Sequence, residues 1–326
     1  MSALKILVIR FSSIGDIVLC TPVIRALKLQ LGAEVHLLSK ASYAVFLENN
    51  PYIDQLHLLD KYPAQKAREL KQLGFDYVID LHNNLRTRII KSVLQTSEFS
   101  FNKLNIEKMQ AVSLKQEVLP KVHIVDRYLE TLESFGVKND GLGLDYFIPN
   151  EARQSLEKFN LPDSFFAWAI GGQHKTKQLP ISQIKQVIDS SAHQFVLLGG
   201  PEDLEEGAQL EAHCKERVLN LCGKLNLNQS AAVVERAKAV LSNDTGLMHI
   251  AAALKKPIIS FWGNTIPELG MYPYYGEHII ENYQLEVKGL SCRPCSKIGF
   301  NACPKKHFNC MMQQNMQEVV HLLKAL

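Results

Sequence analysis

Several features that would place the chain in a specialised class are missing from its 326 residues. No stretch approaches the roughly 18 apolar residues that a membrane-spanning helix requires. Seven cysteines are too few for a disulfide scaffold in a chain of this length, and their odd number argues the same way. A net charge of +3 does not by itself indicate nucleic acid binding. What remains is a globular chain of ordinary composition, with 46% apolar and 21% charged residues.

The first residues also lack the pattern of a secretory signal. A signal peptide has a charged region, an apolar region and a cleavage site after small residues. Residues 5–10, KILVIR, form an apolar run that is too short for this pattern and typical of a strand. We therefore expect a cytoplasmic protein with no transmembrane segment and no nucleic acid partner.

Short apolar runs alternate with helical patterns along the whole chain, which is too long for one ordinary core. The second-half runs are nearly continuous in apolar residues, as expected for strands buried on both faces. The polar, glycine-bearing stretch 137–151 is typical of a linker. We expect two α/β domains with doubly wound, mainly parallel sheets, over residues 1–149 and 150–326. The expected strands cover residues 5–11, 34–40, 54–60 and 76–82, a weaker one at 98–103, then 166–172, 194–200, 217–223, 238–244 and 257–263.

Two helices are expected in the first half. Residues 16–32 have a helical pattern in which Pro22 marks either a kink or a restart after a Thr21 cap. Residues 122–136 have an amphipathic pattern that ends at Gly136.

The first β-α turn contains a single glycine, Gly15, and Asp16 follows it directly. A dinucleotide-binding turn needs several glycines so that the pyrophosphate can approach the backbone, and a carboxylate there would repel it. The turn is therefore not a phosphate cradle. Asp16 either takes part in the chemistry of the site, or it is an acidic residue that stabilises the first turn of a helix.

Polar residues also follow three expected strands of the second half. After 238–242 come Asn243, Asp244, Thr245 and Gly246 at the start of a helix, with His249 close behind. This turn suits an anion, although a helix cap and a packed histidine would have the same sequence.

The other two strand ends carry charged residues. His174, Lys175 and Lys177 follow the glycines at 171–172 and suit a pyrophosphate, or form a solvated basic loop. Glu202 follows the glycines at 199–200, where it either accepts hydrogen bonds from a ribose or begins a helix.

A cationic edge is expected in the first half. His82, Asn83, Arg86 and Arg88 follow the strand at 76–82, and Arg10 ends the first strand. Arginine side chains bind phosphates and carboxylates well, so these residues are candidates for an acidic substrate; a basic helix surface is the alternative.

Cys292, Cys295, Cys303 and Cys310 have the spacing C-x2-C-x7-C-x6-C, with His307 inside the last interval. Such a group is either a structural metal site or a set of reduced thiols in a loop. The spacing is not that of a standard zinc ribbon, and we expect no bound metal.

Three motifs occur together and in order: RFSSIGDIVLCTP at 10–22, KTKQLP at 175–180 and SNDTGLMHIAAAL at 242–254. Together they resemble the lipopolysaccharide heptosyltransferases, glycosyltransferase family 9. The resemblance implies a GT-B fold, in which two Rossmann-like domains enclose a cleft. It also implies inverting transfer of heptose from ADP-heptose to a lipid-linked core acceptor at the inner membrane face, with no required metal or other cofactor.

The resemblance assigns roles to residues of this chain. Asp16 matches the candidate general base, Lys177 the lysine at the donor diphosphate, and Glu202 the residue that holds the ribose. The family often has a tryptophan where this chain has Leu179. The donor-binding turn would consist of Asp244, Thr245, Gly246 and His249, and the acceptor-binding candidates are Arg10, His82, Asn83 and Arg86.

Two other functions remain open at this point. A relative with the same fold could use another nucleotide sugar, because sugar contacts come from loops without a motif. The chain could also be a non-catalytic nucleotide-binding module in which the cysteines mediate assembly. The intact set of Asp16, Lys177 and Asp244 argues against the second.

Overall fold

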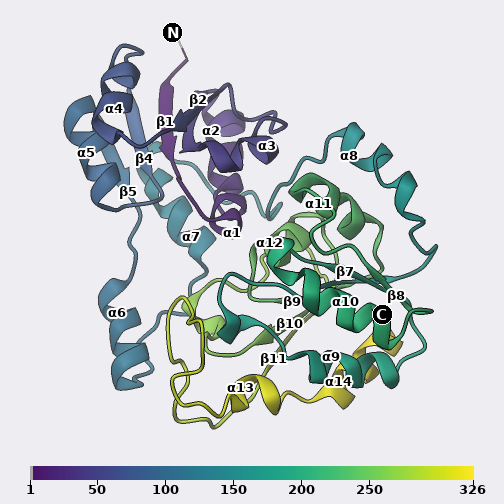
Figure 1. Ribbon diagram of the computed structural model, residues 1–326. Helices are drawn as coiled ribbons and strands as arrows, with labels where there is room; N and C mark the ends of the chain where they lie inside the picture. The colour runs from purple at the N-terminus through teal and green to yellow at the C-terminus, as the bar shows by residue number, and fades with distance from the viewer. Residues whose placement is uncertain (1–2) are drawn as a thin grey trace. The chain divides into compact units, whose positions relative to one another are not determined.

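The computed structural model describes residues 3–326 and divides them into two compact units, each built on its own parallel sheet (Figure 1). The first unit contains the chain up to Lys103 together with 122–147 and 274–278. The second contains 104–121, 148–273 and 279–326. The sequence suggested a single boundary at 149/150, whereas two segments, 104–121 and 274–278, belong to the opposite unit.

The first sheet has five parallel strands in the order β3-β2-β1-β4-β5. Each strand coincides with one of the expected apolar runs, including the weak one at 98–103. β1 is central and its apolar residues are fully buried, which explains its continuous apolar sequence. The strands are β1 (Lys5–Ile9), β2 (Glu34–Lys40), β3 (Gln55–Leu59), β4 (Tyr77–Asp80) and β5 (Ser97–Ser100).

The expected helix at 16–32 is two helices, α1 (Ile14–Val18) and α2 (Thr21–Leu31). A new helix begins just before Pro22, which is the second of the two alternatives predicted for this proline. Thr21 is the first residue of α2, and Cys20 occupies the N-cap position. The hydroxyl of Thr21 donates to the carbonyl of Val18 at 2.8 Å. The unit's other α-helices are α3 (Ala44–Leu47), α4 (Pro63–Lys71), α5 (Leu85–Leu94) and α7 (Ile124–Leu129).

The expected helix at 122–136 forms as α7 followed by a 3₁₀ segment, Glu130–Phe135. It ends at Gly136, whose φ of 71° lies in the left-handed region that favours glycine. The end of this helix is therefore placed as the sequence predicted.

The second sheet has six parallel strands in the order β11-β10-β9-β6-β7-β8. Five coincide with expected runs. The sixth, β11, was missed because it is an edge strand with only one buried residue, and it lacks the apolar run of its neighbours. The strands are β6 (Phe166–Ala169), β7 (Phe195–Leu198), β8 (Val218–Asn220), β9 (Val240–Asn243), β10 (Ile258–Trp262) and β11 (Asn282–Glu286).

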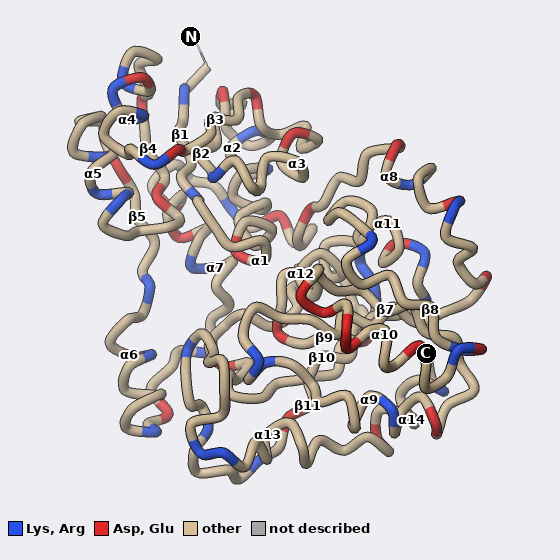
Figure 2. The backbone as a smooth tube through the Cα atoms, viewed as in Figure 1, with Lys and Arg blue, Asp and Glu red and all other residues tan. Residues whose placement is uncertain are grey.

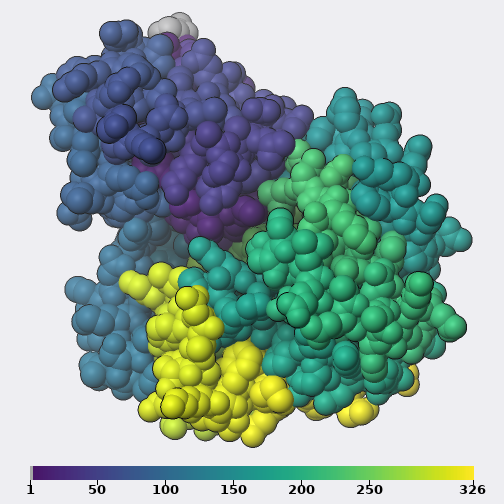
Figure 3. All heavy atoms as spheres, in the orientation of Figure 1, coloured from purple at the N-terminus to yellow at the C-terminus, as the bar shows by residue number. Residues whose placement is uncertain are grey.

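The second unit's core joins the strands to the C-terminal segment. Trp168, Phe195 and Phe261 are fully buried in one cluster with Met311 and Val319. Figure 3 shows this segment, in yellow, packed against the teal and green residues of the same unit. The unit's α-helices are α6 (Asn105–Met109), α8 (Asn150–Gln154), α9 (Ile181–Asp189), α10 (Leu204–His213), α11 (Leu227–Arg236), α12 (Gly246–Ala253), α13 (Asn309–Met312) and α14 (Met316–Ala325).

Among the residues that the structure describes, no helix combines the length and the apolar character needed to cross a membrane.

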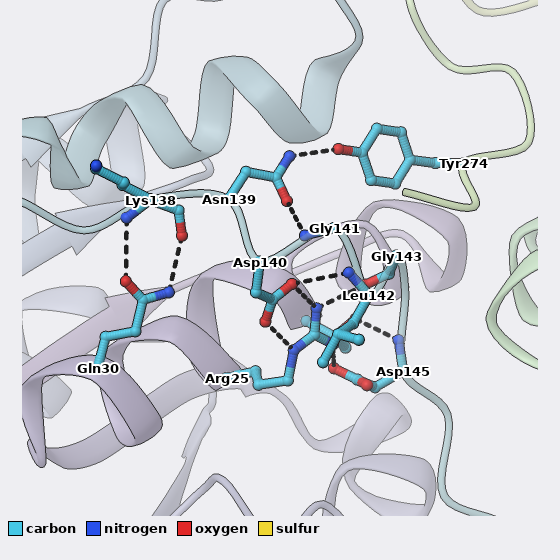
Figure 4. A network of polar contacts seen from close by, with 11 residues as sticks. Arg25, Gln30, Lys138, Asn139, Asp140, Gly141, Leu142, Gly143, Asp145 and Tyr274 are labelled. Carbon is cyan, nitrogen blue, oxygen red and sulfur yellow. Dashed lines mark hydrogen bonds and ion pairs between the residues drawn. The ribbon is translucent and has the colours of Figure 1, made fainter. Parts of the chain in front are cut away.

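The stretch expected to be a linker is held in the first unit by Arg25 (Figure 4). Its guanidinium is 1% exposed and donates to both carboxylate oxygens of Asp140, at 2.7 and 2.8 Å. The same group pairs with Asp145 and donates to the carbonyl of Gly143 at 2.9 Å. Figure 4 also shows Asn139 donating to the hydroxyl of Tyr274, at 2.6 Å. Residues 137–147 are therefore an ordered part of the first unit.

Replacing Arg25 with Met should strongly destabilise the first unit. The variant leaves the carboxylates of Asp140 and Asp145 without their cation in a largely buried position, which costs about 3 kcal/mol of unfolding free energy. Urea unfolding followed by circular dichroism measures the loss. Arg153→Met is the matched control, because Arg153 makes a bidentate but exposed pair with Glu235 that is worth less than about 1 kcal/mol. Equal losses of unfolding free energy in Arg25→Met and Arg153→Met would contradict the buried, structural role of the Arg25 ion pairs.

Candidate functional site

The predicted site residues of each unit lie at the carboxyl ends of its parallel strands. In a sheet whose strands all run one way, these ends share one edge, and ligands of open α/β sheets bind there. Arg10 and Asp16 follow β1, and His82 follows β4. In the second unit Lys177 follows β6 and Asp244 follows β9.

Asp16 is the third residue of α1, and each of its carboxylate oxygens has a partner. Oδ1 pairs with Nη2 of Arg10 at 2.7 Å. Oδ2 accepts hydrogen bonds from the backbone N–H of Ser13 at 3.0 Å and from the Ser13 hydroxyl at 2.8 Å. The side chain is still 19% exposed. Asp16 thus has the geometry of a first-turn helix acid and also presents a fixed carboxylate to solvent.

Arg10 is buried and binds its own chain with every nitrogen of the guanidinium. Nε donates to the carbonyl of Ser12 at 2.8 Å, and Nη1 donates to the hydroxyl of Tyr128 at 2.8 Å and to the carbonyl of Leu81. Although burial opposes the charge, the carboxylate of Asp16 raises the pKa of Arg10 above its usual value. This geometry favours a role in orienting Asp16 over the direct acceptor contact suggested by the sequence.

The backbone after β4 is ordered by Asp80, which is fully buried. Its Oδ1 accepts the N–H groups of His82 and Asn83 at 3.0 and 2.7 Å. Asn83 has a φ of 46° and donates through Nδ2 to the carbonyl of Phe101 at 3.1 Å. Burial and the nearby Arg10 lower the pKa of His82 to about 4, so this histidine is neutral at pH 7.

Phe11 lies between His82 and Arg86. Its ring centroid is 4.8 Å from that of His82, and the guanidinium of Arg86 lies 5.6 Å from it. Arg86 also lines a cleft of about 720 Å³ with several lysines. Of the residues predicted to form a cationic edge, Arg86 lines this cleft, together with Lys40, Lys61 and Lys66 from other parts of the sequence.

Lys177 and Asp244 form an ion pair in the second unit. Nζ of Lys177 lies 2.6 Å from Oδ2 of Asp244 and 3.3 Å from its backbone carbonyl. The hydroxyl of Thr265, after β10, donates to the same carboxylate oxygen at 2.9 Å. The carboxylate of Asp244 therefore holds Lys177 and Thr265 at the edge of the sheet. It does not cap α12.

Asn243 holds the ends of neighbouring segments together. The fully buried side chain accepts the N–H of Leu179 at 3.1 Å and donates to the carbonyls of Ile170 and Gly171 at 2.9 and 3.0 Å. Thr245 occupies the N-cap position of α12 without a side-chain capping bond. The hydroxyl of Thr245 therefore does not cap the first N–H groups of α12. An anion site at a helix start requires that these groups are not capped by a side chain.

The other predicted donor residues differ in exposure. His249 is 2% exposed, within the first turns of α12. Glu202 is exposed, and its carboxylate folds back over Gly200 so closely that a Cβ at that position would lie 2.4 Å from Oε2. Its neighbour Asp203 is buried and accepts the N–H of Gly200 at 2.8 Å.

The cysteine-bearing segment contacts the lysine turn, which the sequence did not indicate. The Thr176 hydroxyl accepts the N–H of Phe300 at 2.8 Å, and the Thr176 N–H donates to the Phe300 carbonyl at 3.1 Å. Arg293 donates to the carbonyls of Gly263 and Thr265 at 2.6 and 3.1 Å. This segment therefore supports the positions of Lys177 and Thr265.

The cysteines are all free thiols. In residues 3–326, no three His, Cys, Asp or Glu side chains are placed together to hold a metal ion. Sγ of Cys292 lies 3.9 Å from Nε2 of His307, and Sγ of Cys295 donates to the carbonyl of Cys292 at 2.9 Å. Burial raises the pKa values of Cys295 and Cys310 to about 11, so both are protonated at neutral pH.

A family model and curated proteins match most of this chain. The model of glycosyltransferase family 9 (heptosyltransferase) matches residues 64–296. Lipopolysaccharide heptosyltransferase 1 of Campylobacter coli is 24% identical over 290 residues, which cover 80% of this chain and 84% of that protein. Lipooligosaccharide heptosyltransferase 2 of Campylobacter jejuni (strain NCTC 11168) is 24% identical over 324 residues, or 96% and 95% of the two chains.

Solved structures show the same fold. The ADP-heptose lipopolysaccharide heptosyltransferase II of Escherichia coli aligns with a TM-score of 0.71 at 18% identity, over 99% of this chain and 98% of that one. An E. coli heptosyltransferase solved with ADP aligns with a TM-score of 0.70 at 19% identity, over 99% of each chain. The two parallel sheets are therefore those of a GT-B fold, as predicted.

Stability should fall when the pH drops from about 6.5 to 4. Burial lowers the pKa values of both His82 and His57 to about 4, whereas unfolded histidines titrate near 6.5. In this window the unfolded chain binds more protons, so acid favours unfolding by about 1 kcal/mol per histidine. Urea unfolding at pH 7 and pH 5 tests this, and His57→Gln should flatten the dependence. Equal stability at both pH values would show that the two histidines titrate normally.

Proposed function

Because the chain belongs to glycosyltransferase family 9, the heptosyltransferases, we propose that it transfers heptose from ADP-heptose to a lipid-linked lipopolysaccharide core acceptor. The reaction is that of an inverting glycosyltransferase. The observation that carries the donor assignment is the arrangement of Lys177, Asp244 and Thr265 at the carboxyl edge of the second sheet.

The second unit provides what a departing nucleoside diphosphate needs. The ammonium of Lys177 is a positive charge fixed by Asp244 at 2.6 Å, and the start of α12 adds N–H groups. In our proposal these groups stabilise the charge that develops on ADP, a task that other transferases give to a divalent metal. Glu202 would bind the ribose hydroxyls, and Gly246 would let the phosphates approach the backbone.

The first unit provides a base for the acceptor. As the acceptor oxygen bonds to the anomeric carbon, the carboxylate of Asp16 takes the hydroxyl proton while the bond to the ADP oxygen breaks. Arg10 and Ser13 fix the position of this carboxylate. A carboxylate is a weak base, so it takes the proton late, when the hydroxyl has become acidic. The cleft with Lys40, Lys61 and Arg86 also contains Asp60, and its lysines and arginine outnumber its acidic residues. It therefore suits the phosphates and carboxylates of a lipopolysaccharide core.

A calorimetric screen of nucleotide sugars tests the donor. ADP-heptose should bind, and UDP- and GDP-sugars should not, in buffer that contains EDTA and no magnesium. Elemental analysis of protein purified without a chelator should give less than one equivalent of metal. Preference for a UDP- or GDP-sugar would favour a relative with another donor. Stoichiometric zinc or iron would make ligands of the four C-terminal cysteines.

Lys177→Ala should weaken ADP binding by about 1.5–3 kcal/mol, because a charge-assisted contact to the diphosphate is lost. Part of this loss comes from Asp244, whose carboxylate is left unpaired near the phosphates. The double variant Lys177→Ala, Asp244→Asn removes that charge and should recover part of the affinity. Lys175→Ala is the matched control, since Lys175 lies in the same turn but pairs with Glu206 on the surface. Unchanged ADP affinity in Lys177→Ala would remove this lysine from the site.

Asp16→Asn should lower turnover by about 10²–10⁴-fold, because the amide cannot accept a proton. Donor affinity should change little, since the proposed donor residues belong to the second unit. Loss of the first-turn charge should cost about 0.5–1 kcal/mol of stability, and the buried Arg10, left without its carboxylate, adds to this loss.

Glu318→Gln controls for the helix effect, because Glu318 is also the third residue of its helix, α14, behind the Asn315 cap. Glu318→Gln should lose only the part of the stability that comes from the first-turn charge, and it should keep its turnover. Near-normal turnover of Asp16→Asn at saturating acceptor would show that Asp16 only supports α1.

A further inference from the structure

Residues 104–121 carry apolar side chains on the outside of the second unit. Ile106, Met109 and Leu114 are 66%, 59% and 62% exposed. The charged residues between the first two, Glu107 and Lys108, are half-buried. A surface helix of a soluble protein normally has the opposite arrangement, with its apolar residues toward the core.

This segment is held against the rest of its unit and is not a loose loop. Nζ of Lys115 donates to the carbonyls of Cys292 and Pro294, at 3.1 and 2.5 Å, and to that of Val112 at 2.7 Å. In Figure 1 the end of the segment lies beside the yellow C-terminal segment. The segment is therefore attached to residues 288–312 through Lys115.

The second segment is basic and partly apolar. No aspartate or glutamate occurs between Lys288 and Gln317. Ile298 and Phe300 are 56% and 40% exposed. We call residues 104–121 and 288–312 together the basic apolar surface. It contains two glutamates and eight lysines and arginines, and Figure 2 shows several blue bands along both segments.

We propose that the basic apolar surface docks the enzyme on an anionic lipid bilayer. Exposed Ile, Met, Leu and Phe side chains enter the boundary between headgroups and acyl chains, and the surrounding lysines bind lipid phosphates. Two copies of such a surface would repel each other through their like charges, which disfavours a symmetric dimer. The inference rests on the proposed function, in which the acceptor is anchored in a membrane.

Vesicle sedimentation of the full-length protein tests this surface. The wild type should bind vesicles of phosphatidylethanolamine and phosphatidylglycerol, and bind phosphatidylcholine vesicles much less. The triple variant Ile106→Gln, Met109→Gln, Leu114→Gln should bind the anionic vesicles at least about tenfold more weakly. Lys297→Gln, Lys305→Gln, Lys306→Gln should have a similar effect without altering any apolar residue. A control with Leu29, Leu142 and Ile279 changed to Gln, all exposed in the structure, should bind like the wild type.

Transfer to two acceptors separates this proposal from the proposed function. The apolar variant should keep wild-type transfer to a water-soluble core oligosaccharide and lose transfer to acceptor embedded in vesicles. No transfer to the soluble acceptor by the wild type would contradict the proposed function, whatever the vesicle result. Vesicle binding that is equal in wild type and variants would overturn the docking surface. So would a wild-type dimer, seen in size-exclusion chromatography, that only the apolar variant converts to monomer.

Discussion

Parallel strand pairing is the constraint on which the two halves of the site depend. When every strand of a sheet runs in one direction, residues far apart in sequence arrive at the same edge. In the second sheet this brings Lys177, Asp244 and Thr265 into contact from three different loops. In the first sheet it brings Arg10 and Leu81 together at the ends of β1 and β4. Packing of the buried strands thus fixes the polar geometry at their ends.

Each unit places one carboxylate beside one cation at this edge, with different consequences. Asp244 is nearly buried, and its role is to hold Lys177 and the hydroxyl of Thr265. Asp16 is the more exposed of the two and is held by Arg10, which is itself buried and fully bonded to its own unit. In the proposed reaction, the carboxylate of Asp244 fixes the positive charge of Lys177 for the leaving group, and the carboxylate of Asp16 accepts a proton.

The sequence predicts the strands well because parallel strands buried on both faces must be continuously apolar. It fails for β11, an edge strand without that requirement. The three motifs also predict the residues at each strand end. They do not predict that Arg10 contacts Tyr128, or that Thr176 contacts Phe300, because these contacts join residues 118 and 124 positions apart. Nor does the polar stretch 137–151 reveal the buried Arg25 that orders most of it.

The most direct test of the account is analysis of the product formed from ADP-heptose and a lipopolysaccharide core acceptor. Mass spectrometry and NMR would identify the added sugar and its anomeric configuration. The account predicts one heptose added per ADP released, with the anomeric configuration inverted relative to the donor. ADP release without a glycosylated acceptor, or a product with retained configuration, would contradict it.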